Sequence, residues 1–214
     1  MKTKALLLTV ALGAASAATS MAQVYSQNAV GYINVPVKHG FNLIADQLIT
    51  SDRSIQALFP NAPDQLTVYK FNPGSGFTII VNDISGIGGW EDPTLTVPLG
   101  GGVFVYNPQV ADYNVTFVGE VPQGTLTTPI VHGFQIISSQ VPQAGHIQNV
   151  LGLLPADQDQ VYKYNNPGGY QIITYDLSGL GDWDDVPNLN VGDAVFFYAP
   201  GATHTSWTRT FTVN

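Results

Sequence analysis

The sequence predicts an all-β protein made of two tandem copies of a unit of about 93 residues, each with one short helix. Residues 36–92 align with residues 129–185 at a constant offset of 93 without a gap, and 22 of the 57 pairs are identical. A fixed period of this kind defines the folding unit. Short apolar stretches alternate with Gly- and Pro-rich turns, which is typical of strands. Each unit is expected to be a β-sandwich or a small barrel, and the pattern leaves both open.

The first 22 residues have the pattern of a secretory signal peptide. A short cationic start precedes residues 5–18, which are uncharged and mostly apolar, and residues 20–22 fit a cleavage site. The apolar part is shorter than the roughly 20 residues that a helix needs to span a bilayer. We therefore expect export to the periplasm, the cell surface or the medium, without membrane insertion. Copy one is expected at 23–121 and copy two at 122–214.

Charge and composition exclude some partners. After removal of the signal peptide, five basic and 15 acidic residues remain among 192, which gives a net charge of −10. Such a chain has no basic face for nucleic acid and is repelled by anionic lipid. Hydrophobic residues make up 44% of the sequence, which excludes general disorder. The chain has no Cys, so its apolar core must stabilise the exported fold without disulfides.

Local signals predict the elements of each copy. Strands are expected at 30–35 and 41–45, followed by a short helix in which Ile55 and Leu58 have i, i+3 spacing. A hairpin follows, with a Pro-Gly turn between its strands. The remaining expected elements are the hairpin strands 66–72 and 77–82, the closing strands 103–106 and 116–118, and in copy two a helix with Ile147, Val150 and Leu151, the hairpin strands 161–165 and 170–175, and the closing strands 195–198 and 210–212.

The hairpin strands alternate aromatic and other residues. Tyr69 and Phe71 share one face of their strand, and Lys70 lies on the other. This alternation predicts that the two aromatic rings point to a core and the lysine to water.

Several phrases of the chain resemble a family of uncharacterised exported proteins of verrucomicrobial bacteria. They are 30–35, 40–45 (GFNLIA), 68–72 (VYKFN) and 118–126 (VGEVPQGTL). The resemblance covers nearly the whole mature chain and implies an exported all-β module, with no activity to transfer. More loosely, the chain is similar to modules of secreted multidomain proteins that have Trp where this chain has Phe41.

Two acidic loops are the best candidates for a metal site. Residues 83–92 and 176–185 share the pattern Asp-x-Ser-Gly-x-Gly-x-Trp-acidic-Asp. Calcium prefers carboxylate, hydroxyl and carbonyl oxygens, and glycine permits the sharp turn between them. The alternative is a solvated loop whose side chains cap its turns. The candidate calcium ligands are Asp83, Ser85, Asp92, Asp176, Ser178, Asp182 and Asp185.

Trp90 and Trp183 occupy equivalent positions in these loops. Exposed indoles beside carboxylates could stack on sugar rings, whereas buried indoles would close the end of each core. His39 and His132 are expected to be turn residues bonded to backbone, and His204 to lie on the surface. No catalytic constellation or phosphate-binding loop is present in the sequence, so we expect no enzymatic activity.

The sequence therefore predicts an exported, non-enzymatic β-repeat protein that is a structural or adhesive component of the cell surface or extracellular matrix. Its expected partners are other surface proteins, itself or polysaccharide. The alternative is a carbohydrate-binding or other ligand-binding module, with calcium as the one candidate cofactor.

Overall fold

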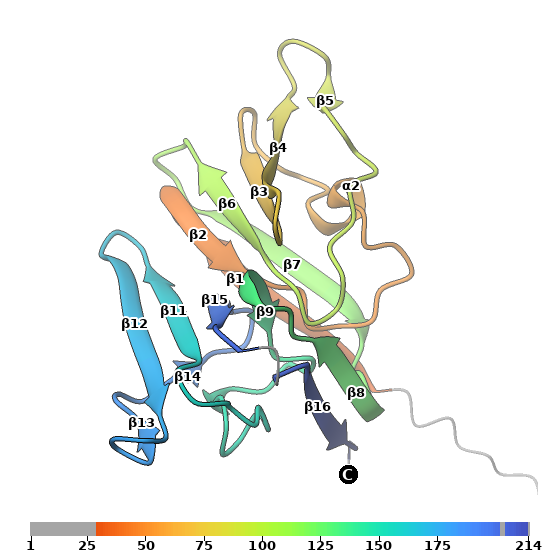
Figure 1. Cartoon of the computed structure of the whole chain (residues 1–214). Coiled ribbons are helices and arrows are strands. Elements are labelled where there is room, and N and C mark those ends of the chain that lie inside the picture. Colours follow the sequence, from red (N-terminus) through yellow and green to blue (C-terminus); the bar gives the residue numbers. More distant parts are fainter. Residues whose placement is uncertain (1–28, 202–203, 214) are drawn as a thin grey trace, which may run out of the picture.

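The computed structural model describes residues 29–201 and 204–213, which form a nearly all-β structure (Figure 1). The predicted signal peptide lies outside the described residues. The described elements are β1 (Val30–Val37), β2 (Gly40–Ile44), α2 (Ile55–Leu58), β3 (Thr67–Asn72), β4 (Gly76–Asp83), β5 (Gly89–Trp90), β6 (Val103–Asn107), β7 (Tyr113–Glu120), β8 (Gly124–Pro129), β9 (Gly133–Ser138), β10 (Gly145–His146), β11 (Gln160–Asn165), β12 (Gly169–Asp176), β13 (Asp182–Trp183), β14 (Asn188–Leu189), β15 (Ala194–Ala199) and β16 (Ser206–Phe211). The all-β prediction is confirmed.

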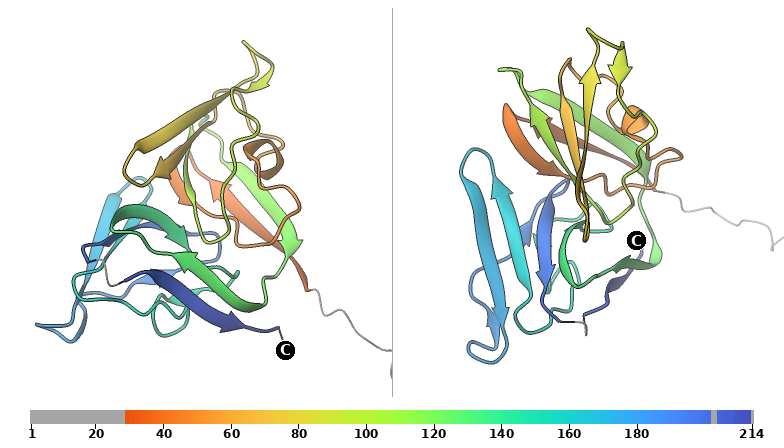
Figure 2. Two further views of the ribbon diagram at one scale, coloured as in Figure 1. Left: turned by 45° about the vertical axis from the view of Figure 1, so that its right-hand side comes forward. Right: turned by 45° about the horizontal axis from the view of Figure 1, so that its top comes forward.

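Two five-stranded sheets dominate the fold. The first sheet has the order β2-β6-β3-β4-β5, and the second has the order β13-β12-β11-β15-β9. Three two-stranded sheets accompany them, β1-β7, β8-β16 and β10-β14, and all the pairs are antiparallel. Figure 2 shows the first sheet, in orange to yellow-green, beside the second sheet, in teal to blue.

The strand registers of the two sheets correspond. Gly40 of β2 pairs with Asn107 of β6, and Gly133 of β9 pairs with Ala199 of β15. Gly133 follows Gly40 by 93 residues, whereas Ala199 follows Asn107 by 92 residues. The β8-β16 pair is related to the β1-β7 pair by the same two offsets, 93 residues from β1 to β8 and 92 residues from β7 to β16. The segment from the start of β13 to the end of β15 is therefore one residue shorter than the segment from the start of β5 to the end of β6.

Each five-stranded sheet has a core on one face. The core of the first sheet lies against the β1-β7 pair, with Val35 and Phe117 facing Val68 and Ile80 across it. The core of the second sheet lies against β16, where Trp207 is fully buried. Each sheet is open, and a two-stranded layer covers one of its faces.

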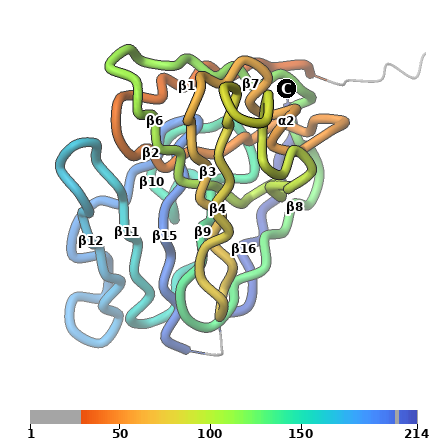
Figure 3. The backbone as a smooth tube through the Cα atoms, turned by 90° about the horizontal axis from the view of Figure 1, so that it is seen from above, coloured from red at the N-terminus to blue at the C-terminus, as the bar shows by residue number. Residues whose placement is uncertain are grey.

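The other faces of the two sheets meet at a seam. Leu43, Phe104, Ile136 and Ala194 form a third buried cluster there. In Figure 3 the β3-β4 hairpin lies over β9, and β3 is in contact with β9. The seam therefore joins segments that are far apart in the sequence.

Two backbone hydrogen bonds cross this seam. The N–H of Ala45 donates to the carbonyl of Gly192 at 2.9 Å, and the N–H of Ser138 donates to the carbonyl of Gly100 at 2.8 Å. The two donors are 93 residues apart and the two acceptors 92. Both bonds thus use corresponding positions of the two sheets.

The predicted helix of the second copy is not a helix. Residues 147–151 form hydrogen-bonded turns, in which the carbonyl of His146 accepts from the N–H groups of both Val150 and Leu151. The imidazole Nδ1 of His146 also accepts from the backbone N–H of Gln148 at 3.2 Å. In the first copy the Ser54 hydroxyl caps α2 instead, accepting from a helix N–H.

Candidate functional site

Trp90 and Trp183, the candidates for sugar stacking, are both buried, as the alternative interpretation of these residues predicted. Trp90 is 6% exposed and packs against Phe59, with 6.2 Å between ring centroids. Trp183 is 8% exposed, packs against Tyr175, and donates its indole N–H to Gln148 Oε1 at 2.9 Å. Neither indole offers a free face to a sugar ring. Their positions are those of core residues that close the ends of the two sheets.

The acidic loops use their first carboxylate as a turn cap. Asp83 Oδ1 accepts from the backbone N–H three residues further along the chain at 2.9 Å, and from Ser85 Oγ at 3.4 Å. Asp176 Oδ1 accepts from the equivalent N–H at 2.9 Å and from Ser178 Oγ at 3.2 Å. Each of these carboxylates therefore caps its own turn through one of its two oxygens.

The later carboxylates of the loops also accept turn hydrogen bonds. Asp92 Oδ1 accepts from the hydroxyl and the N–H of Thr94, and these bonds lower the pKa of Asp92. Asp182 and Asp185 each accept from the next backbone N–H, at 2.8 and 2.7 Å. Within the described ranges no three His, Asp or Glu side chains gather as a metal ion would require. The predicted calcium ligands are therefore not assembled into a shell.

Glu91 and Asp184 have a different role in the same loops. Glu91 accepts from the N–H of Val81 through its carboxylate and donates its own N–H to the Val81 carbonyl, both at 3.0 Å. Asp184 makes the same pair of bonds with Thr174, at 2.8 and 2.9 Å. Each acidic residue thereby continues the pairing of β4 or β12 past a two-residue partner strand. Charged groups at such an edge also oppose strand addition.

His204 is buried, although the sequence pattern predicted a surface position for it. His204 is 7% exposed, and its Nδ1 contacts Asp159 Oδ2, which also accepts from the N–H of Ala156. Its ring packs edge-on against Phe197. The prediction of a surface position is wrong, because its partner lies 45 residues away and gives no local signal. His39, in contrast, is an exposed turn residue whose Nδ1 contacts the carbonyl of Gln109.

An aromatic face, which the sequence pattern did not identify, opens beside the seam. Tyr69 and Phe71 do share a face of β3, but it is Val68 on the opposite face that enters the first core. Both rings pack against the third buried cluster, so they do point to a core, but the sequence pattern did not say which one. They pack at the seam and line pockets open to solvent.

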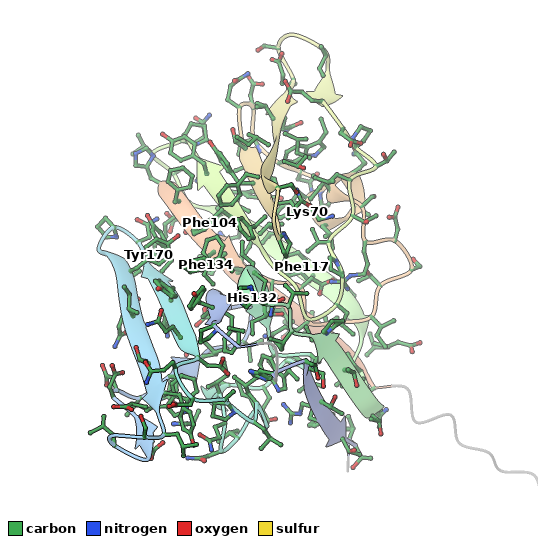
Figure 4. All side chains as sticks on the ribbon, viewed as in Figure 1. Lys70, Phe104, Phe117, His132, Phe134 and Tyr170 are labelled. Atoms are coloured by element: carbon green, nitrogen blue, oxygen red, sulfur yellow. The ribbon has the colours of Figure 1, made fainter. Side chains whose placement is uncertain are left out.

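The first aromatic pocket has a volume of about 320 Å³. Phe77 and Ile79 of β4 form its outer wall and are 44% and 52% exposed. Phe104 forms part of its wall at the seam, and Tyr170 comes from the second sheet (Figure 4). Tyr164 of the second sheet also lines the pocket. The pocket is lined by Phe41, Tyr69, Phe77, Ile79, Phe104, Tyr164 and Tyr170.

A second aromatic pocket of about 360 Å³ lies across the seam. Its lining residues are Phe71, Phe134, Tyr162, Tyr170, Ile172 and Phe196. Four of them stand 93 residues after residues of the first pocket, so corresponding surfaces of both sheets are used. Burial raises the pKa of Tyr162 and of Tyr170. The two pockets share Tyr170 and form one apolar surface, the aromatic face.

A polar cleft of about 470 Å³ lies at one end of the seam. Lys38 follows β1, Lys163 belongs to β11, and Asp193 precedes β15. The Lys163 ammonium donates to the carbonyl of Asn188 at 2.9 Å and lies 3.6 Å from Asp193 Oδ2. We name this space the seam cleft. It is lined by Asn34, Val35, Pro36, Lys38, Asn42, Leu43, Ile44, Lys163, Tyr164, Asn165, Asn166, Asn190, Val191 and Asp193.

A corresponding cleft of about 310 Å³ lies at the other end of the seam, but its lining is less polar. Val131 stands there at the position of Lys38, Gly101 at that of Asp193, and Lys70 at that of Lys163. This asymmetry is visible in the sequence once the two copies are aligned with the structural registers.

Comparison with protein-family models, with curated proteins and with solved structures finds no match for the chain. The described residues include no helix with the length and apolar character to cross a membrane. The geometry of the faces and clefts is therefore the ground for a functional proposal.

Proposed function

We propose that the chain is an exported, non-enzymatic β protein that serves as a structural or adhesive component of the cell surface or extracellular matrix. The observation that carries the proposal is the aromatic face, two adjoining apolar pockets with exposed walls. Large exposed apolar patches on an isolated protein are typical of interaction sites. Aromatic side chains contribute much contact area at a small entropic cost, which suits such a surface.

The state of the polar groups supports a non-enzymatic role. The carboxylates of the acidic loops are engaged by turn N–H groups, as described above. The His204 and Asp159 pair is buried and lines none of the aromatic pockets or seam clefts. A catalytic base must reach the proton that it abstracts, and this imidazole has no such access.

We further propose that the chain is a duplicated unit, whose two copies pack about a pseudo-twofold axis. Phe71 packs against Phe196 with 5.0 Å between centroids, and Tyr164 against Phe104 with 5.3 Å. Exchange of the copies converts one pair into the other. Phe104 and Phe196 are themselves corresponding residues, and they meet at 5.8 Å. A contact between equivalent residues is expected where the axis passes.

This proposal agrees with the resemblance to exported β-repeat proteins and with the predicted signal peptide. The alternative function, carbohydrate binding, has no support from Trp90 and Trp183 because both are buried. The seam cleft is a different candidate for such a ligand.

The test is attachment of beads that carry the mature chain to the cells that export it. Ile79→Thr with Ile172→Thr removes apolar surface from both pockets while keeping β-branched residues in β4 and β12. We expect attachment to fall several-fold. The matched control is Val30→Thr with Val118→Thr, on the β1-β7 pair, where the valines are 72% and 59% exposed.

The control should attach as the unaltered chain does. Equal attachment of all three proteins would contradict an adhesive role for the aromatic face. Thermal melts of each variant establish that the fold is retained, since exposed substitutions usually change stability by less than about 0.5 kcal/mol.

A further inference from the structure

The seam cleft concentrates positive charge on an acidic protein. The sequence has seven Lys and Arg residues, and the predicted signal peptide contains two of them. Of the remaining five, Arg53 is paired with Asp46, and Arg209 donates to an amide. Two of the three remaining lysines, Lys38 and Lys163, line this one cleft.

The two lysines differ in how they are held. The ammonium of Lys163 is fixed by the Asn188 carbonyl and by Asp193, so its position is defined before a ligand arrives. Lys38 is exposed, and in the described part of the chain its ammonium has no hydrogen bond or ion pair. One positive charge of the cleft is therefore uncompensated. An anionic group placed there would gain a charge-assisted hydrogen bond.

Asparagine amides provide the acceptors. Asn166 donates its Nδ2 to the carbonyl of His39 at 2.8 Å, and Asn190 donates its Nδ2 to Asp193 at 3.1 Å. Both amides are anchored through nitrogen, which leaves their Oδ1 atoms to accept from a ligand. Hydroxyl groups are suitable donors for such oxygens. Tyr164 adds apolar area on which the carbon face of a ring can lie.

The corresponding cleft shows that the fold does not require this polar set. The same backbone registers carry Val131, Gly101 and Pro73 where the seam cleft has Lys38, Asp193 and Asn166. Main-chain bonds across the seam occur at both ends. The greater polarity of the seam cleft is therefore a property of that cleft and not of the seam.

We propose that the seam cleft binds a carboxylated saccharide, with the carboxylate of a uronate unit on Lys38 and Lys163 and its hydroxyls on the anchored amides. The ring occupies the space beside Tyr164. This site adjoins the aromatic face, with which it shares Tyr164, and does not depend on the adhesive role proposed for that face.

Titration calorimetry of the mature chain with tri-galacturonate tests the proposal. The methyl ester of the same trisaccharide is the neutral comparison. We expect saturable binding of the acid, weakened by added salt because ions screen exposed charges, and at least about tenfold weaker binding of the ester. Lys38→Gln should weaken binding of the acid by a similar factor.

The matched control is Lys70→Gln, because Lys70 occupies in the less polar cleft the position that Lys163 has in the seam cleft. It should bind the acid as the unaltered chain does. Lys163→Gln is a second variant, and melting curves check that each variant is folded. The proposal is overturned if the ester binds as well as the acid, if Lys70→Gln weakens binding as much as Lys38→Gln, or if no saturable binding is measured.

Discussion

Substitution of Gly102 by alanine tests how closely the two sheets pack at the seam. A Cβ built on Gly102 would overlap the Cβ of Ala194 and would lie 2.9 Å from the carbonyl oxygen of Ile44 and 3.0 Å from Ile136 Cγ2. The first two neighbours are fixed to the backbone, so no rotamer change can relieve them. In the Gly102→Ala variant, the sheets must separate by roughly 1 Å to restore ordinary contact.

The expected cost follows from overpacking of a well-filled interior, which lowers the free energy of unfolding by about 1–3 kcal/mol. For a chain of this size, each kcal/mol lowers the melting temperature by roughly 2–4 °C. Because Phe104 and Ala194 share one buried cluster, separation at Gly102 should also loosen the aromatic contacts. Urea denaturation monitored by near-ultraviolet circular dichroism reports both effects.

Gly89→Ala is the matched control. A methyl group added at Gly89 would have no neighbour within 4 Å, and Gly89 does not have a positive φ, so the same chemical change should alter stability by less than about 0.5 kcal/mol. Equal denaturation midpoints for the two variants would refute the close packing described for the seam.

Three further predictions concern the cores and the acidic loops. Arg53→Met should lower the free energy of unfolding by about 3–5 kcal/mol, because it leaves the carboxylate of Asp46 buried without its partner. Desolvation already raises the pKa of Asp46 in the folded state above its unfolded value of 3.8. The loss of unfolding free energy, measured by urea denaturation, should therefore shrink as pH falls toward 3.8 and the carboxylate becomes protonated. A loss that does not depend on pH would contradict this prediction. Trp207→Ala should lower the free energy of unfolding by about 3–5 kcal/mol in the same assay, because the indole is fully buried. Trp207→Phe should lower it less, although this variant leaves the Leu151 carbonyl without its indole donor. Equal losses for the two variants would argue against the burial of the indole. Melting temperatures in millimolar calcium and in chelator should agree, because within the described residues no three acidic side chains gather in these loops. A rise of several degrees in calcium would restore the metal hypothesis.

The sequence predicted those parts of the fold that depend on neighbouring residues. The strands expected at 66–72 and 77–82 are β3 and β4, displaced by a residue at their ends, because Pro and Gly in the turn fix the hairpin locally. The turn caps at Asp83 and Asp176 were the stated alternative to calcium and needed only residues of the same loop. Hydrogen bonds between neighbouring residues can therefore be predicted from the spacing of those residues in the sequence.

Contacts between distant segments were not readable in this way. Period-two alternation separates Val68 from Tyr69 but does not say which face is inside, and here both faces of the sheet are partly covered. The pairing of His204 with Asp159 and the meeting of Phe104 with Phe196 have no local signature. One signal was present: Phe41 and Tyr69 have aromatic counterparts in the second copy, although they belong to a face that is half exposed.

If the chain is a duplicated unit, as proposed, the aromatic face and the seam cleft have different roles. Two identical subunits would necessarily carry identical clefts, since symmetry repeats every substitution. Joining the copies in one chain removes that constraint, so Lys38 and Val131 can occupy corresponding positions. The aromatic residues stayed alike in both copies, as a shared contact surface requires, while the clefts diverged. On this argument the aromatic face acts as one symmetric surface, and the seam cleft supplies a single site for a smaller ligand.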